Sequence, residues 1–263
     1  MAYQALILRN PARAAATVQE FDRLGITSWC AQLIETVWPA DRSALQRMAS
    51  DLVAGDYSWL VFTSVNTVKV VQQVLAGALL PEQLRLASVG EKTTEAIKRH
   101  LGRSVDFEAE EQSAAGMLAA WIPEPGARIC YPHGDLASST LADGLGKYPV
   151  QVNEFIAYET VDAPAPGTPV SEPEAAAGLN VLPANRIGDR LEEQDLVVFP
   201  APSVVRRFVQ LAGTQLPGKL QTIAIGHPTA RAMERAGLPV HAVASAPTPQ
   251  GLARAAQDLL RHR

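Results

Sequence analysis

The chain has 263 residues, of which 47% are hydrophobic and 19% charged, and its formal net charge is −4. This balance is typical of a globular protein with one large domain or two smaller ones. The negative charge argues against general nucleic-acid binding, because nucleic-acid-binding domains usually carry a basic stripe, but it still allows an anionic small ligand. Cys30 and Cys130 are far apart and form no C-x-x-C motif, so we expect neither a disulfide framework nor a zinc site.

The N-terminal apolar run at residues 5–8 stops at Arg9, Asn10 and Pro11. This run is too short for a secretory signal peptide. No segment approaches the roughly 20 apolar residues of a transmembrane helix. We therefore expect a cytoplasmic protein that makes no contact with a membrane.

Short apolar runs alternate with amphipathic stretches along the chain. We expect strands, in chain order, at 5–8, 30–38, 59–64, 85–90, 127–132, 152–160, 195–200, 221–226 and 240–244. We expect helices at 67–75, 92–101, 204–213 and 229–237. In the first helix, Val68, Val71 and Leu75 fall on one face. This alternation predicts an α/β protein with parallel sheets and crossover helices.

The sequence also contains an internal repeat. Residues 59–68 (WLVFTSVNTV) align with 196–205 (LVVFPAPSVV), and 87–97 align with 223–233. The repeat predicts two similar lobes and leaves two arrangements open. The lobes are either sequential, dividing near residue 123, or swapped, with the first 35 or so residues joining the C-terminal hundred. Residues 162–183 contain five prolines and predict a mobile connection.

Gly, Ser, Thr or Asn residues stand between several strand ends and the helices that follow them. Taken singly, most of them predict N-caps, in which a side-chain oxygen accepts a hydrogen bond from a free backbone N–H. Taken together, they line the carboxyl ends of parallel strands, where open α/β sheets bind ligands. Helix N-termini offer free N–H groups and a partial positive charge there. Two lobes facing each other would bind a large polyanion without a basic surface.

The common catalytic motifs G-x-S-x-G, P-loop and G-x-G-x-x-G are missing from the sequence. His133 and Asp135 share one turn, for which ordinary turn chemistry is a better interpretation than a catalytic triad or a metal site. Arg206 and Arg207 face different sides of their helix, which favours a solvated face over an anion clamp.

Five segments resemble the uroporphyrinogen-III synthase family. They are 56–68 (DYSWLVFTSVNTV), 86–97 (LASVGEKTTEAI), 155–160 (FIAYET), 195–208 (DLVVFPAPSVVRRF) and 222–255. Their order and spacing carry the resemblance, which covers nearly the whole chain except 163–190.

This resemblance implies two flavodoxin-like α/β lobes joined by a two-stranded linker, with a discontinuous N-terminal lobe. Residues 1–35 and 164–263 would form the first lobe and 41–154 the second. Residues 36–40 and 155–163 would form the linker strands. The resemblance further implies a monomer that uses no cofactor and no metal.

The resemblance also implies a lyase of haem and other tetrapyrrole biosynthesis. Its substrate, hydroxymethylbilane, is a linear tetrapyrrole with eight carboxylates, which fits the polyanion site expected from the helix ends. The enzyme cyclises it to uroporphyrinogen III with loss of water, inverting the last pyrrole ring through a spiro intermediate. Positioning of the substrate is the main task, and departure of the hydroxyl needs a general acid.

The tyrosine that is the favoured acid in this family matches Tyr158. We expect Phe155 and Ile156 to anchor its strand, and Tyr158, of opposite parity to Phe155, to point away into the cleft. The expected substrate-binding residues are Arg9, Thr63, Ser64, Asn66, Gly90, Thr93, Gly134, Ser203, Gly226 and Thr229.

Two positions depart from the pattern of the family. Ala201 stands where the other copy of the repeat has Ser64, and His133 stands where an arginine is common. These departures keep a second hypothesis open, a non-catalytic two-lobed anion-sensing or regulatory domain of the same fold.

Overall fold

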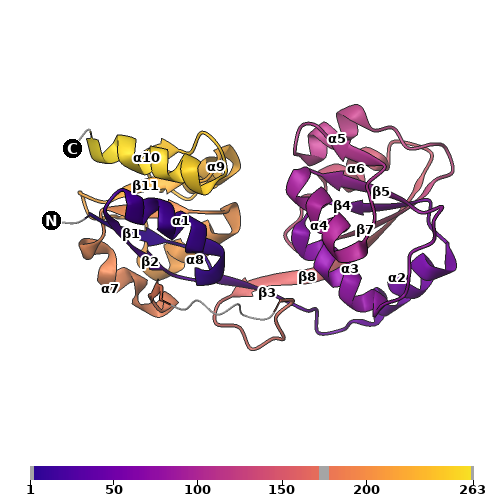
Figure 1. Cartoon of the computed structure of the whole chain (residues 1–263), viewed down its shortest axis with the longest axis horizontal. Coiled ribbons are helices and arrows are strands. Elements are labelled where there is room, and N and C mark those ends of the chain that lie inside the picture. Colours follow the sequence, from indigo (N-terminus) through magenta and orange to yellow (C-terminus); the bar gives the residue numbers. More distant parts are fainter. Residues whose placement is uncertain (1–2, 172–177, 262–263) are drawn as a thin grey trace. The chain divides into compact units, whose positions relative to one another are not determined.

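The protein is described by a computed structural model that covers residues 3–171 and 178–261. The chain forms two compact units (Figure 1). Unit 1 comprises Met1–Glu35, Asp162–Ala165 and Pro173–Arg263, and unit 2 comprises Thr36–Val161 and Pro166–Glu172. The chain thus passes between the units within strand β3 (Ile34–Val37) and near the end of the long strand β8 (Gln151–Asp162).

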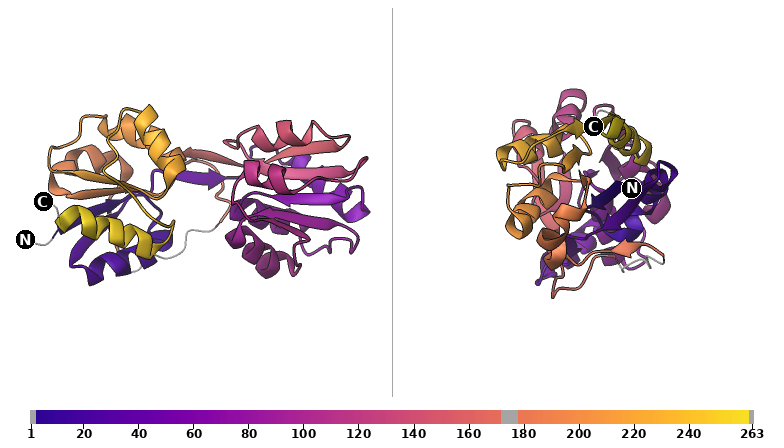
Figure 2. Two further views of the ribbon diagram at one scale, coloured as in Figure 1. Left: turned by 90° about the horizontal axis from the view of Figure 1, so that it is seen from above. Right: turned by 90° about the vertical axis from the view of Figure 1, so that its left-hand side faces the viewer.

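Unit 1 contains a parallel sheet with the strand order β12–β11–β10–β1–β2–β9. The strands are β1 (Tyr3–Ile7), β2 (Ile26–Cys30), β9 (Asn180–Val181), β10 (Leu196–Phe199), β11 (Gln221–Ala224) and β12 (Ala242–Val243). Helices cover both faces of the sheet, as the two views in Figure 2 show. Strands buried on both faces are continuously apolar, which explains the runs ALI in β1 and LVVF in β10.

One face of this sheet packs against α1 (Pro11–Arg23) and α10 (Pro249–Arg261). The other face packs against α7 (Ile187–Arg190), α8 (Pro202–Ala212) and α9 (His227–Arg235). Two short 3₁₀ turns, at Ala184–Arg186 and Leu191–Glu193, flank α7.

Unit 2 contains a sheet with the order β3–β8–β7–β4–β5–β6. Its other strands are β4 (Trp59–Phe62), β5 (Arg85–Val89), β6 (Phe107–Ala109) and β7 (Arg128–Gly134). Helices α2 (Ser43–Ala54), α3 (Val65–Leu75) and α4 (Glu91–Leu101) cover one face. Helices α5 (Ala114–Ala120) and α6 (Thr140–Leu145) cover the other.

The two sheets share one spatial plan, as the internal repeat predicts. The series β8–β7–β4–β5–β6 in unit 2 corresponds to β2–β1–β10–β11–β12 in unit 1. Numbered along the chain, the series in unit 1 reads 2-1-3-4-5, which is the flavodoxin-like order. Unit 2 departs from that order, because the strands that come first in unit 1 come last in unit 2. Each sheet still places its helix N-termini at the carboxyl edge of the strands.

Residues 166–171, here called the strap, attach to unit 2 rather than to the discontinuous lobe that the sequence predicts for 164–263. Pro169 forms an antiparallel bridge with Val37, and the side-chain amide of Gln73 donates to the Val170 carbonyl at 2.9 Å. These contacts explain the difference, since they lie entirely within unit 2. Residues 172–177 of the predicted mobile connection lie outside the described part of the chain.

No helix within residues 3–171 and 178–261 is long and apolar enough to cross a membrane. The same residues contain no group of three or more His, Cys, Asp or Glu side chains arranged to hold a metal ion.

Candidate functional site

The phenol of Tyr158 lies at the N-terminus of a helix. Tyr158 belongs to β8, and its hydroxyl oxygen is 3.3 Å from Oγ of Ser64. Ser64 is the N-cap of α3, and its Oγ accepts a hydrogen bond from the Thr67 N–H at 3.1 Å. Free N–H groups and a partial positive charge at this helix end favour a negative charge nearby. The hydroxyl of Tyr158 therefore lies beside the cap residue at the positive end of α3.

A β-bulge determines the direction of Tyr158. The register between β7 and β8 shifts before Gly134, which pairs with Tyr158 and leaves Ala157 as an extra residue. An extra residue reverses the alternation of side chains along a strand. Phe155 and Tyr158 consequently pack against the same core cluster, and Ile156 is 42% exposed. The expectation that Tyr158 points away from Phe155 is wrong because of this bulge. The expectation that Ile156 anchors the strand is also wrong, because ordinary alternation places it on the face opposite its neighbour Phe155.

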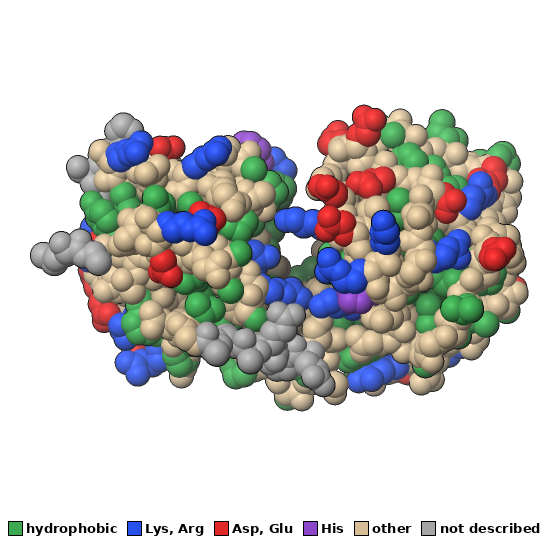
Figure 3. Space-filling view, in the orientation of Figure 1, with side chains coloured by type: hydrophobic (Ala, Val, Ile, Leu, Met, Phe, Trp, Pro, Cys, Tyr) green, Lys and Arg blue, Asp and Glu red, His purple; other side chains and the backbone are tan. Residues whose placement is uncertain are grey.

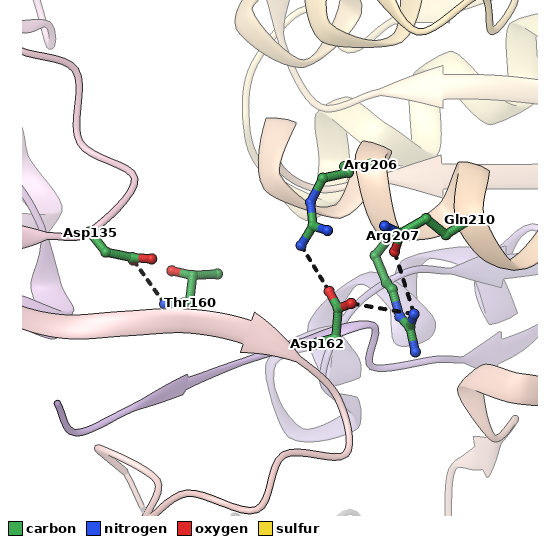
Figure 4. Close-up of polar contacts among 6 residues, drawn as sticks. All are labelled: Asp135, Thr160, Asp162, Arg206, Arg207 and Gln210. Carbon is green, nitrogen blue, oxygen red and sulfur yellow. Dashed lines mark hydrogen bonds and ion pairs between the residues drawn. The ribbon is translucent and has the colours of Figure 1, made fainter. Parts of the chain in front are cut away.

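Gly134 provides the space for the Tyr158 ring. A Cβ atom at this position would lie 2.6 Å from ring atoms Cε2 and Cζ, closer than atoms approach without displacement. The next residue, Asp135, donates its backbone N–H to the Tyr158 carbonyl at 3.1 Å. Its Oδ1 accepts the Thr160 N–H at 2.8 Å (Figure 4). The residues at the end of β7 thus hold β8 at Tyr158 and two residues after it.

The other candidate residues of unit 2 follow β4 and β5 at the carboxyl edge of the same sheet. Thr63 forms a side-chain hydrogen bond with the buried Tyr131, and Asn66 lies in the first turn of α3. Gly90 is the N-cap of α4 with φ of 87°, a conformation that favours glycine. Thr93 lies in the first turn of α4 and is 5% exposed. The cap of α4 is therefore a backbone cap, and the Thr93 side chain is buried.

The candidate residues of unit 1 occupy the corresponding edge of its own sheet. Arg9 follows β1, and burial, together with the neighbouring Arg13, lowers the pKa of its guanidinium. Gly226 is the N-cap of α9, and Thr229 in its first turn is 2% exposed. Ser203 lies in the first turn of α8, whose cap residue makes no side-chain hydrogen bond, as expected for alanine at this position.

His133 does not face Asp135. Its Nε2 is 3.2 Å from Oε2 of Glu154, and its Nδ1 is 2.9 Å from the carbonyl oxygen of Gly134. The imidazole also contacts the Tyr131 ring, with centroids 4.8 Å apart. Sequence reasoning missed Tyr131 and Glu154, because only the pairing of β7 with β8 brings them beside the site.

Arg206 is exposed, as the predicted solvated face requires, but Arg206 and Arg207 both pair with an acidic side chain. Arg206 Nη2 lies 3.0 Å from Oδ1 of Asp162, and Arg207 Nη1 lies 3.3 Å from Oδ2 (Figure 4). Asp162 is the last residue of β8 and lies beside α8 within unit 1. One carboxylate thus brings together two guanidinium groups that leave different sides of the helix.

The chain matches a family model, HEM4, described as uroporphyrinogen-III synthase HemD, over residues 15–254. The chain belongs to the uroporphyrinogen-III synthase family. The resemblance drawn from the five sequence segments is thereby confirmed.

Individual relatives agree with this assignment. A uroporphyrinogen-III synthase of Chlorobaculum parvum (strain DSM 263 / NCIMB 8327) is 24% identical over 245 residues, which cover 89% of this chain and 90% of the relative. A mutant uroporphyrinogen III synthase of the extremely thermophilic bacterium Thermus thermophilus matches all of both chains with a TM-score of 0.68 at 15% identity. The synthetase of Helicobacter pylori 26695 matches 98% of this chain and 99% of its own with a TM-score of 0.58 at 15% identity. These structures confirm the α/β fold with two mainly parallel sheets.

Proposed function

We propose that this member of the family cyclises hydroxymethylbilane to uroporphyrinogen III, with loss of water and inversion of the last pyrrole ring. The observation that carries the mechanism is the phenol of Tyr158 at the capped N-terminus of α3. Family membership over residues 15–254 supports the reaction.

In this mechanism Tyr158 protonates the leaving hydroxyl, which departs as water. A phenol is protonated at neutral pH and so can act as the donor. The resulting azafulvene is stabilised by its pyrrole nitrogen, and the phenolate by the Ser64 hydroxyl and the N-terminus of α3. Attack by the substituted carbon of the last ring forms the spiro intermediate, which rearranges with that ring inverted. The proton released when the last ring regains aromaticity returns to the phenolate, so that overall only water is lost.

We propose that backbone N–H groups bind most of the substrate carboxylates. The N-termini of α3 and α4 in unit 2, and of α8 and α9 in unit 1, present such groups at the carboxyl edges of their sheets. Arg9 supplies a cation among the candidate residues. Units 1 and 2 act as the two domains of a monomeric enzyme that needs neither cofactor nor metal, and it works in the cytoplasm.

The alternative, a non-catalytic anion sensor, is not favoured. Its main support is Ala201, which leaves α8 without a side-chain cap. Backbone N–H groups at that helix end are unaffected by the substitution, and the Ser64–Tyr158 pair is present in unit 2.

The deciding experiment is a product assay with freshly prepared hydroxymethylbilane. The products are oxidised and the type I and type III porphyrins are separated. Without enzyme the chain closes without inversion and gives type I, so this reaction is the control. We expect the full-length protein to give type III. Type I alone, at the rate of the control, would refute the enzyme hypothesis and favour the sensor.

A further inference from the structure

Unit 2 carries a cavity that contains none of the candidate substrate residues. Its volume is about 760 Å³, and it lies between the start of α2, the body of α3, the end of α4 and the strap. Cavities of this size hold small organic molecules. All of its lining residues belong to unit 2, so it is a complete feature of that unit.

The cavity is basic, although the chain as a whole is acidic. Its basic side chains are Arg42 at the N-cap of α2, Lys69 in α3 and His100 in α4. Among the described residues, no Asp or Glu lines the cavity, and the remaining polar groups are amides and hydroxyls. Figure 3 shows blue Lys and Arg side chains around a purple His side chain on this unit. A local positive field of this kind attracts anions even when the net charge is negative.

The two permanent cations are held at the wall of the cavity. The Arg42 guanidinium lies over the indole ring of the buried Trp38, 4.5 Å from its centroid. This stacking leaves the edge of the guanidinium free for bidentate bonding to an oxyanion. Lys69 Nζ donates to Oγ of Ser171 in the strap at 3.2 Å, which leaves two further N–H donors. The Gln72 side chain adds an amide donor.

His100 reports on the same field. Burial lowers the pKa of its imidazole, and Lys69 and Arg99 lower it further. Burial is the larger cause and the two cations add to it, and a neutral imidazole supplies one more hydrogen-bond donor to the cavity.

We propose that this cavity binds a small organic dianion, carrying two carboxylates or one phosphate group, at a site separate from that of the tetrapyrrole substrate. Arg42 grips one anionic group through its planar fork, and Lys69 neutralises the second charge. The Gln72 amide of α3 and the hydroxyl groups of Thr168 and Ser171 in the strap satisfy the remaining oxygens. The inference rests on unit 2 alone, so it does not depend on the proposed reaction.

Calorimetric titration of the full-length protein tests the proposal, with succinate and glycerol 3-phosphate as separate probes and neutral succinamide as the control ligand. We expect saturable binding of at least one dianion at one site per chain, and none of succinamide. Binding of succinate, of glycerol 3-phosphate or of both identifies the anionic group that the site accepts. Saturable binding of neither dianion overturns the proposal.

Variants locate the binding site. Arg42→Gln and Lys69→Gln should each weaken binding at least tenfold. Arg47→Gln, an exposed charge change on the same helix α2, and Thr93→Ala in the candidate substrate site should not. Thermal unfolding of each variant establishes that it is folded. If Arg47→Gln weakened dianion binding as much as Arg42→Gln does, the effect would come from the overall charge of the protein and not from the cavity. If only Thr93→Ala weakened binding, the dianion would bind in the substrate site. Either result overturns the proposal.

A final variant tests whether the chain's own carboxylates occupy the cations. Glu172 and Glu174 follow the strap in the sequence. Wild-type protein should bind the dianion about as well as the Glu172→Gln/Glu174→Gln double variant. Binding that appears only in the double variant would show that these carboxylates neutralise the cavity, and the proposal would fail.

Discussion

Replacement of Tyr158 by phenylalanine removes one hydroxyl and keeps the ring that packs beside Gly134. The hydroxyl contacts Ser64 at 3.3 Å, and a neutral hydrogen bond of this kind contributes about 1 kcal/mol to stability. Loss of a general acid costs roughly 10²–10⁴-fold in rate, or about 3–5 kcal/mol in barrier height. A domain with a typical stability of about 5–15 kcal/mol stays folded after losing 1 kcal/mol. Unfolding of the variant therefore cannot account for a rate loss of the size expected from removal of the general acid.

The assay is the initial rate of type III formation by folded Tyr158→Phe protein. We expect that rate to fall roughly 10²–10⁴-fold and the product to keep its inverted ring, because positioning of the substrate does not depend on the hydroxyl. Tyr148→Phe, which removes a hydroxyl elsewhere in unit 2, is the matched control and should keep the wild-type rate. A Tyr158→Phe rate within a few fold of wild type would remove Tyr158 from the mechanism. Water or a substrate carboxyl would then be the proton donor.

Three further predictions follow from the same contacts. Gly134→Ala should lower the free energy of unfolding by about 1–3 kcal/mol, because its Cβ would lie 2.6 Å from the Tyr158 ring; adding Gly134→Ala to Tyr158→Phe should slow type III formation little further, and a fully multiplicative loss would contradict this coupling. Thr93→Ala and Thr229→Ala should each reduce kcat/KM in the product assay by an amount equivalent to about 1–2 kcal/mol. Unchanged kcat/KM in both variants would contradict a role for these residues in substrate binding. Burial raises the pKa of the Cys30 thiol from 9.0 to about 11, so the contribution of the protonated thiol to stability is present below pH 9 and is lost as the pH rises toward 11. Between pH 8 and pH 10.5, the free energy of unfolding measured with denaturant should fall more for wild type than for Cys30→Ala. Equal falls for the two proteins would refute this prediction.

Local patterns in the sequence predict much of the architecture. The apolar runs at 59–64 and 195–200 contain β4 and β10, and the amphipathic stretches 67–75 and 204–213 closely match α3 and α8. Periodicity and the Ser64 cap depend on residues near one another in the chain, so the sequence reveals them directly. The run at 30–38 was a poorer guide. In the structure this run contains the last residue of β2 and all of β3. The polar residues of β2 gave no sign in the sequence that this segment is a strand within the sheet.

The internal repeat also carried information about tertiary structure. Its two copies predict two similar sheets, and the sheets do share one spatial strand order. Which chain segments complete each sheet was left open by the repeat, because the same strands can pair in sequential or swapped lobes. The resemblance to a family favoured the swapped arrangement, and the units of the structure have the first 35 residues together with the C-terminal segment.

Only the tertiary structure decided how side chains from distant segments meet. The register shift before Gly134 turns Tyr158 toward the side of Phe155 and α3, and no feature of the FIAYET segment predicts that bulge. Asp162 joins Arg206 and Arg207 across more than 40 residues of sequence. The strap closes a basic cavity against helices that precede it by about a hundred residues. Such contacts depend on strand register and on where the chain crosses between sheets, which are set by long-range packing and not by the local periodicity of the sequence.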